Sequence, residues 1–443
     1  MAIPILGMAF LITGEDASSF YTISLAEKTF LKERTMFSGL ILNGGQLIAF
    51  SYFYQILHMS EVAKMLPKIQ MVDLVRQHAR YHHELEESIQ RVLQKGAFIN
   101  GPEVKSFAQN LALYLNIPHV VPCGNGTDAL QIALMALGLQ AGDEVLTTSF
   151  NYVAAAEAVA LLGLKPVFVE VESGTFNLDV RQVEKHIGPK TKAIIAVHLF
   201  GQACDMENIM ALAQQHGLYV IEDNAQSLGT DILYRGKWVK AGTIGNIGTT
   251  SFFPTKNLGC MGDGGAIYTQ DETLAEKCRS ISVHGQGQRY EFKQIGINSR
   301  LDTLQAALLE VKLKYLGQAL EKRAYWASRY HTLLEHLANV ELPSSVSYSS
   351  HSYNQFTLKI KDGKRDSLKQ FLTDQGIPTM VYYPKPLHQQ PAFGHLGYTA
   401  QDLPISSQLC EEVLSLPIHP ELEEEQVVFI GKMVNTFFGG MAS

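Results

Sequence analysis

The alternation of short apolar segments with amphipathic ones limits the possible folds of this chain more than any other feature of its sequence. Strands are predicted at residues 119–122, 144–148, 166–171, 193–198 and 218–222. Helices are predicted at residues 72–95, 103–115, 128–137, 154–162, 180–186 and 206–216. Strands that are nearly all apolar are buried on both faces, which is typical of a parallel sheet covered by helices. We therefore predict an α/β fold built on a large, mainly parallel sheet.

The length and the C-terminal pattern predict a second, smaller domain. A chain of 443 residues is too long for one ordinary hydrophobic core. One long helix is predicted at residues 303–333, and helices of this length often bridge two domains in α/β enzymes. Short strands at residues 354–361 and 380–383 and helices at residues 365–375 and 423–437 follow it. We expect a large domain over residues 65–320 and a smaller C-terminal α+β domain over residues 321–443.

Composition and charge exclude several classes of protein. The chain has 46% hydrophobic and 18% charged residues, as in globular proteins and unlike disordered ones. A net charge of -7 and the lack of a basic stripe argue against nucleic-acid binding. The five cysteines are scattered and form no CxxC pair, which favours reduced thiols in a cytoplasmic enzyme over disulfides or a metal site. We expect no metal and no nucleic-acid partner.

The first 64 residues differ in character from the rest. An apolar stretch at residues 3–13 is short and lacks a basic start, so it is a poor signal peptide. A second stretch at residues 39–57 has the length of a membrane span, but it is interrupted by Asn43, Gln46 and Gln55. Two interpretations are favoured: a true start at Met59, Met65 or Met71, or a variable extension. A membrane anchor is the third and least favoured, and we expect no membrane partner.

Three segments that follow strand ends carry residues suited to chemistry, because ligands gather at the carboxyl ends of strands in open α/β sheets. One is the glycine-rich turn around Gly126 and Thr127, which leads into a helix. Backbone N–H groups and the helix dipole favour an anion at such a turn. The turn does not match a Walker P-loop or a dinucleotide-binding GxGxxG motif.

The second segment ends in the adjacent acids Glu222 and Asp223. The pleat of a strand directs neighbouring side chains to opposite faces, so one acid can face a site while the other faces helices or water. A carboxylate there can keep a pyridine nitrogen protonated, which makes the ring an electron sink. The alternative is an acid that caps the next helix.

The third segment carries Lys256 among Phe, Pro, Leu and Met residues. Desolvation disfavours the ammonium form and so suits a nucleophilic amine, whereas the alternative is an ordinary solvated lysine. A phosphate cradle, an acid for a ring nitrogen and a lysine for an aldehyde are together what pyridoxal phosphate requires. Their order along the chain is that of the fold type I enzymes.

Several motifs from about Met71 onward resemble those of the DegT/StrS family of sugar-nucleotide aminotransferases. They are Phe98-Ile-Asn-Gly-Pro-Glu-Val104, Gly126-Thr-Asp-Ala-Leu130, Ile221-Glu-Asp-Asn-Ala-Gln226-Ser, Ser251-Phe-Phe-Pro-Thr-Lys256-Asn-Leu-Gly, Gly262-Asp-Gly-Gly, Asn298-Ser-Arg300-Leu-Asp and Tyr383-Pro-Lys-Pro-Leu-His388. The resemblance implies a fold type I PLP-dependent transferase. It implies that Lys256 forms a Schiff base with pyridoxal phosphate and moves protons, while Asp223 pairs with the pyridine nitrogen.

The resemblance also implies further site residues. Gln226 and Tyr152 would lie against opposite faces of the ring, and the phosphate would be held by Gly126, Thr127 and Ser251. Asn298 would complete the phosphate site from the partner subunit, so we expect a homodimer with shared active sites. Arg300 and Tyr383 would contact the sugar nucleotide.

Several positions leave questions open. Ala155 stands where many relatives have Thr, and Tyr382 where some have His. His198 ends a predicted strand, and it either touches substrate or is satisfied within the fold.

The implied reaction moves an amino group from a donor, by family habit glutamate, to a nucleotide-linked keto-sugar. The sequence looks closest to enzymes that aminate UDP-2-acetamido-2-deoxy-3-oxo-glucuronate, which suggests cell-surface polysaccharide or lipopolysaccharide biosynthesis. The alternatives are a dTDP-3-keto-6-deoxyhexose 3-aminotransferase and a sugar 4-aminotransferase. From other classes, a PLP-dependent sugar dehydratase would carry histidine in place of Lys256, and a non-catalytic regulator would have lost Lys256 or Asp223.

Overall fold

The computed structural model describes residues 68–439 of the chain. The apolar stretches at residues 3–13 and 39–57 and the candidate starts Met59 and Met65 lie outside these residues. Within the described part, no helix is both long and apolar enough to cross a membrane.

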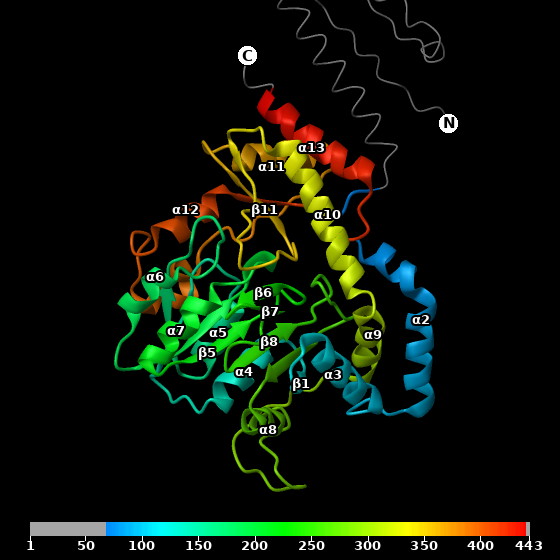
Figure 1. The fold of residues 1–443 in the computed structure, drawn as a ribbon, viewed down its shortest axis with the longest axis vertical. Coiled ribbons are helices and arrows are strands. Elements are labelled where there is room, and N and C mark those ends of the chain that lie inside the picture. Colours follow the sequence, from blue (N-terminus) through cyan, green and yellow to red (C-terminus); the bar gives the residue numbers. More distant parts are fainter. Residues whose placement is uncertain (1–67, 440–443) are drawn as a thin grey trace, which may run out of the picture. The chain divides into compact units, whose positions relative to one another are not determined.

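A seven-stranded sheet forms the centre of the larger part of the molecule (Figure 1). Its strands are β1 (His119–Cys123), β2 (Glu144–Thr148), β3 (Lys165–Val169), β4 (Thr191–Val197), β5 (Tyr219–Asp223), β8 (Ile247–Ser251) and β9 (Gly265–Thr269). Their order is β1-β9-β8-β5-β4-β2-β3. Only β9 runs antiparallel to its neighbours in this sheet, and the other pairs are parallel. The prediction of a large, mainly parallel sheet is confirmed.

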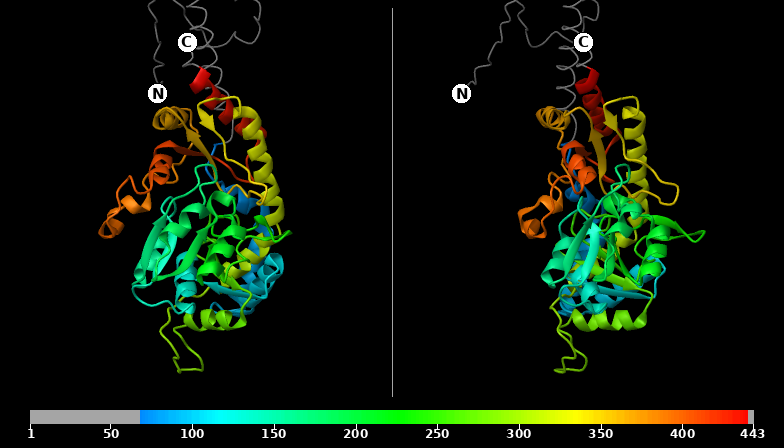
Figure 2. Two further views of the ribbon diagram at one scale, coloured as in Figure 1. Left: turned by 60° about the vertical axis from the view of Figure 1, so that its left-hand side comes forward. Right: turned by 90° about the vertical axis from the view of Figure 1, so that its left-hand side faces the viewer.

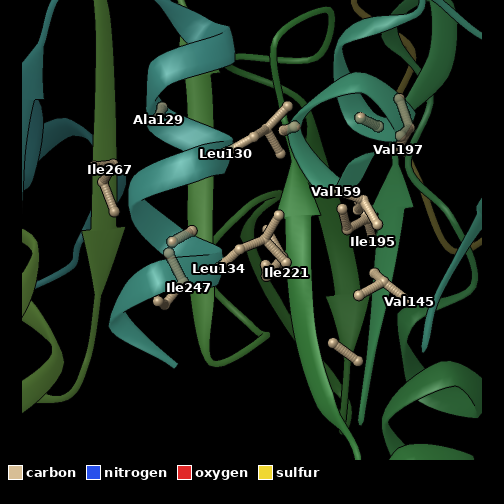
Figure 3. Close-up of a cluster of buried hydrophobic side chains, with 14 of the residues drawn as sticks. Ala129, Leu130, Leu134, Val145, Val159, Ile195, Val197, Ile221, Ile247 and Ile267 are labelled. Atoms are coloured by element: carbon tan, nitrogen blue, oxygen red, sulfur yellow. The ribbon is translucent and has the colours of Figure 1, made fainter. Parts of the chain in front are cut away.

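Helices cover both faces of this sheet because its strands are apolar on both sides. The helices are α3 (Pro102–Leu115), α4 (Gly126–Ala136), α5 (Ala154–Leu161), α6 (Val180–Val183), α7 (Met206–His216), α8 (Glu272–Ile281) and α9 (Thr303–Leu313), while α2 (Leu74–Lys95) packs on α9. In β4, Ile195 joins the core beneath α4, α5 and α8, whereas Ile194 joins the core beneath α7. Figure 3 shows the first of these cores, where Leu134 of α4 packs with Ile221 and Ile247.

A three-stranded sheet lies at the C-terminal end of the chain. Its strands are β10 (Val340–Glu341), β11 (Phe356–Ile360) and β12 (Val413–Leu416), and its helices are α10 (Leu316–Leu334), α11 (Arg365–Asp374), α12 (Pro404–Glu412) and α13 (Glu424–Gly439). Figures 1 and 2 show α10 extending from the large sheet toward this smaller one. A two-stranded hairpin, β6 (Asp231–Tyr234) with β7 (Lys237–Lys240), follows β5.

Two elements differ from the prediction. The single helix predicted at residues 303–333 is wrong, because the chain breaks between α9 and α10. The break contains Tyr315, whose N–H donates to the carbonyl of Lys312 in a tightened turn and whose ring stacks on Tyr81 at 4.3 Å between centroids. This long-range contact has no signature in the local sequence.

The strand predicted at residues 380–383 is also absent. Met380 exchanges two backbone hydrogen bonds with Ser415 of β12, and the pairing then stops. The chain leaves the small sheet there because it crosses to the large one, where the N–H of Leu387 donates to the carbonyl of Ser149. This crossing brings the segment after Met380 to the carboxyl edge of the large sheet.

Candidate active site

The predicted site residues gather at the carboxyl ends of neighbouring strands. Asp223 ends β5 and Ser251 ends β8, and these two strands are paired in parallel. Tyr152 follows β2 after a short turn. The sheet therefore brings together, at one edge, side chains that are about a hundred residues apart in the chain.

Glu222 and Asp223 point to opposite faces of β5. The Glu222 carboxylate is fully buried and accepts hydrogen bonds from His198 Nε2 at 2.9 Å and from the N–H groups of Gly242, Ile244 and Gly245. His198 Nδ1 accepts from the N–H of Cys204, so the ring proton lies on Nε2. Of the two interpretations of His198, the structure supports a histidine satisfied within the fold.

Asp223 has fewer partners than its neighbour. Its side chain accepts one hydrogen bond, from the N–H of Ala225 at 3.0 Å, although the residue is only 7% exposed. Burial raises the pKa of Asp223, and the Ala225 hydrogen bond and the charge of Lys256 offset part of this shift. A buried carboxylate with spare acceptor capacity suits a protonated ring nitrogen.

Lys256 lies in a closed loop directly after β8. The backbone N–H of Lys256 donates to the carbonyl of Phe253 at 2.9 Å. The backbone N–H of Cys260 donates to the carbonyl of Phe252 at 2.8 Å. Burial lowers the pKa of Lys256 to about 8, and the Asp223 carboxylate partly opposes this shift. The structure therefore supplies an amine whose proton is easily lost, as covalent chemistry with an aldehyde requires.

The turn before α4 provides an anion site. Asn125 caps the helix, its side chain accepting from the N–H of Asp128 at 2.8 Å, while the N–H groups of Gly126 and Thr127 open the first turn. A Cβ at Gly126 would lie 2.7 Å from the Cβ of Ser251, so only glycine allows the two segments this approach. Gly126, Thr127 and Ser251 thus lie together at a helix N-terminus, where a phosphate is favoured.

Aromatic residues and Gln226 lie on the same edge of the sheet. Gln226 Nε2 donates to the hydroxyl of Tyr383 at 3.0 Å, and its Oε1 accepts from the N–H of Phe200 at 2.8 Å. The Tyr152 and Tyr383 ring centroids are 6.4 Å apart, and Tyr152 is 59% exposed. An exposed aromatic ring at the same sheet edge as a buried acid suits a planar ligand.

These groups fit pyridoxal phosphate: an anion cradle, an acid for a ring nitrogen, an amine and an aromatic surface. A model of the DegT/DnrJ/EryC1/StrS aminotransferase family matches residues 80–435. The chain belongs to this family.

Relatives across nearly their whole length support this assignment. The chain is 46% identical over 372 residues to the "Pleiotropic regulatory protein" of Geobacillus stearothermophilus, covering 84% of this chain and 98% of the relative. It is 43% identical over 362 residues to the UDP-2-acetamido-2-deoxy-3-oxo-D-glucuronate aminotransferase of Pseudomonas aeruginosa, covering 82% and 98%. It is 38% identical over 371 residues to the dTDP-3-amino-3,6-dideoxy-alpha-D-galactopyranose transaminase of Aneurinibacillus thermoaerophilus, covering 83% and 99%.

Solved structures agree with the relatives. A DegT DnrJ EryC1 StrS aminotransferase from Brucella abortus superposes with a TM-score of 0.79 at 42% identity, covering 84% of this chain and all of that one. NtdA from Bacillus subtilis, solved with bound cofactor PMP, gives a TM-score of 0.76 at 32% identity, covering 84% and 85%. The protein is a fold type I aminotransferase, and its cofactor is pyridoxal phosphate.

The segment with Asn298 and Arg300 lies behind the anion cradle of this aminotransferase. Between them, Ser299 is buried and its Oγ accepts from the N–H of Gly124 at 2.8 Å. Asn298 is exposed. Arg300 is half-buried, and within residues 68–439 its guanidinium has no hydrogen-bond or ion-pair partner. A cation left unpaired near the site suits an anionic substrate group.

The two departures from the family pattern lie in different surroundings. Ala155 lies in α5 and is buried in the core, where a hydroxyl would need a hydrogen-bond partner. Tyr382 is half-buried, and its ring centroid lies 6.0 Å from that of Tyr383, so it belongs to the aromatic wall of the site.

Sequence reasoning gave no role to Ser149 or His388. Ser149 Oγ and His388 Nδ1 are 2.6 Å apart, both residues are buried, and the N–H of His388 also donates to Ser149 Oγ. The pair fastens the Tyr383 segment to the end of β2. His388 was part of a recognised motif, but only the fold reveals that its partner lies 239 positions away.

Proposed function

We propose that Lys256 binds the cofactor covalently and that the enzyme moves an amino group from an amino acid, glutamate, to a nucleotide-linked keto-sugar. The acceptor proposed is UDP-2-acetamido-2-deoxy-3-oxo-glucuronate. The observation that carries the proposal is that a lysine of lowered pKa and a buried aspartate with a single hydrogen bond lie at the same edge of the sheet.

When bound, the cofactor supplies an electron sink for the negative charge that develops on the substrate carbon. Asp223 would hold a proton on the ring nitrogen and so strengthen that sink. Because burial lowers its pKa to about 8, the Lys256 amine loses its proton more readily than an ordinary lysine, so Nζ can accept a proton from the donor carbon and return one later. Gly126, Thr127 and Ser251 would anchor the phosphate, which keeps the ring in place during these transfers.

Substrate recognition is assigned to the unpaired cation and the aromatic wall. Arg300 would meet the anionic diphosphate or sugar carboxylate, and Tyr383 would contact the sugar from a position fixed by Gln226. Tyr152 and Gln226 would lie on opposite faces of the cofactor ring. The shared chemistry of a UDP or dTDP sugar satisfies these groups equally, which is why the acceptor requires a direct test.

A homodimer with shared sites is part of the proposal. Asn298 is exposed beside the cradle, and the nearby loop presents the exposed apolar residues Tyr290, Phe292 and Ile295. Contiguous exposed apolar residues commonly mark protein interfaces. A molar mass of one chain by light scattering at working concentration would contradict this part.

The names of the relatives specify different sugars, so a dTDP-linked keto-sugar remains an alternative acceptor in this proposal. One relative's name specifies a UDP-linked glucuronate and another's a dTDP-linked dideoxygalactose. A third relative is named a regulatory protein, but this chain carries both Lys256 and Asp223 at the site. We place the enzyme in the cytoplasm, in the synthesis of cell-surface polysaccharide such as lipopolysaccharide.

The decisive experiment has two parts. Purified enzyme should absorb visible light and be bleached by borohydride, with the cofactor then found on the peptide containing Lys256. Lys256→Ala should lose the visible band and all turnover, and a variant that keeps both would sink the assignment. Assays with matched UDP- and dTDP-linked 3-keto- and 4-keto-sugars would then identify the acceptor, and a clear preference for a dTDP sugar would replace our first choice.

A further inference from the structure

Lys312 is a buried lysine that lies outside the candidate active site. It lies in α9 and is 6% exposed, and its ammonium group has three acceptors. Nζ donates to the carbonyl of Gly259 at 2.7 Å, to Gln77 Oε1 at 3.2 Å and to His78 Nε2 at 3.2 Å. An ammonium has three N–H donors, so all of its hydrogen-bonding capacity is used.

Lys312 has no ion-pair partner within residues 68–439, so these three acceptors must compensate for its desolvation. Burial lowers the pKa of Lys312 to about 8, with Cys260 and Glu421 opposing the shift. Burial and the Lys312 charge lower the pKa of His78, which keeps its ring neutral and able to accept. An apolar side chain would occupy this side of α9 at lower desolvation cost, so the lysine calls for a specific reason.

The carbonyl that Lys312 holds belongs to the Lys256 loop. Gly259 comes three positions after Lys256, and a Cβ there would lie 2.3 Å from the carbonyl oxygen of Pro254. The loop is therefore folded tightly on itself between Phe252 and Cys260, where the N–H of Cys260 donates to the carbonyl of Phe252. Fixing the Gly259 carbonyl fixes the backbone from which the Lys256 side chain projects.

The other side of the same loop is held by Asn257. Its Nδ2 donates to Ser352 Oγ at 3.0 Å and to the carbonyl of Leu228 at 3.2 Å, and its Oδ1 accepts from Asn354. The contacts with Ser352 and Asn354 join the loop to the segment that leads into β11, and the contact with Leu228 joins it to the segment after β5. Lys312 supplies the opposing attachment, to α9 and through it to the first turn of α2.

We propose that Lys312 is a positioning residue for Lys256: its ammonium holds the Gly259 carbonyl and so aims the Lys256 amine toward Asp223. The proposal rests on the proposed role of Lys256. It assigns Lys312 no contact with cofactor or substrate.

The test compares Lys312→Met with the matched control Lys359→Met. Lys359 in β11 is 4% exposed, and its ammonium donates to Ser173 O at 2.8 Å and Ser173 Oγ at 3.0 Å and pairs with Glu341. Both variants lose a buried ammonium and should lose stability. Cofactor affinity is measured by titrating apo-protein with pyridoxal phosphate, and the pH midpoint of the visible band is recorded.

Lys312→Met should weaken cofactor binding roughly tenfold and move the pH midpoint, because a misplaced amine reacts less favourably. Lys359→Met should keep both at the wild-type values. The proposal is overturned if Lys312→Met binds the cofactor as tightly as wild type with an unmoved midpoint while its stability falls like that of the control.

A second variant covers the case in which Lys312→Met does not fold. Gln77→Leu removes one acceptor from a half-buried position on α2 and should change both readouts in the same direction by a smaller factor. Wild-type values for this variant would also contradict the proposal. Failure of the Lys256 assignment is distinct, since it would appear as a visible band that survives Lys256→Ala.

Discussion

At the carboxyl end of β5, the adjacent acids Glu222 and Asp223 lie on opposite faces of the strand and have different surroundings. Behind the strand, Glu222 is enclosed by His198 and three backbone N–H groups. In front of it, Asp223 receives one hydrogen bond and faces the charge of Lys256. The carboxylate of Glu222 stabilises the fold through its hydrogen bonds, whereas the carboxylate of Asp223 keeps acceptor capacity for a ligand.

The pKa values of the two acids move in opposite directions. Burial alone would raise the pKa of Glu222, but the hydrogen bonds from His198, Gly245 and Gly242 outweigh it and lower the pKa. Burial dominates at Asp223 and raises its pKa. Both acids are buried, so the difference between their pKa shifts comes from their partners: Glu222 has His198 and several N–H donors, whereas Asp223 has one N–H donor.

The largest expected effect is the loss of stability on replacing Glu222. Glu222→Ala would leave His198 and three N–H groups without their acceptor in a fully buried place, which should lower the free energy of unfolding by about 3–5 kcal/mol. Denaturant unfolding of the apo-protein measures it. Glu425→Ala, at an exposed position of α13, serves as the control and should be neutral. A loss below about 1 kcal/mol for Glu222→Ala would mean that the rear network is not essential to the fold.

The next largest effect is expected on replacing Asp223, and it concerns activity and not stability. Asp223→Asn keeps the shape but cannot hold a proton on the cofactor ring, so turnover should fall on the order of 10²–10³-fold. Folding and cofactor content should be preserved, as circular dichroism and absorbance would verify. Near-normal turnover would show that the front acid does not serve the reaction, and the contrast between the two faces would then fail.

Sequence alone predicted the front region better than the rear one. The apolar run that ends in Glu222 and Asp223 predicts both a strand and the position of its carboxyl end, which is where the candidate active site was expected. The hydrogen-bond partners of Glu222 could not be predicted from the sequence, because Gly242, Ile244 and Gly245 lie beyond the β6–β7 hairpin.

The same limit applies to contacts between distant segments. Ser149 meets His388 across 239 positions and Lys312 meets Gln77 across 235, and neither pair leaves a periodic signal. The break at Tyr315 depends on Tyr81 in another helix. Local pattern fixes strands and their ends, whereas pairings of this kind exist only after the chain has folded.

The smallest expected effect is a difference in pH dependence between two isosteric variants of the apo-protein, Glu222→Gln and Asp223→Asn. The folded-state pKa of Glu222 lies below the ordinary value of 4.5, so its stabilisation is present above pH 4.5 and is lost as the pH falls through the folded pKa. The folded-state pKa of Asp223 lies above 3.8, so its favourable contribution is present below pH 3.8 and is lost as the pH rises through the folded pKa.

Relative to wild type, Glu222→Gln should therefore lose stability as the pH rises from acid to neutral, while Asp223→Asn should gain it. Unfolding free energies of wild type and both variants, measured across pH 3.5 to 7 in one buffer series, give the two differences directly. If both differences run in the same direction with pH, the charge on one of these acids is misassigned, and the front and rear of the strand are electrostatically alike.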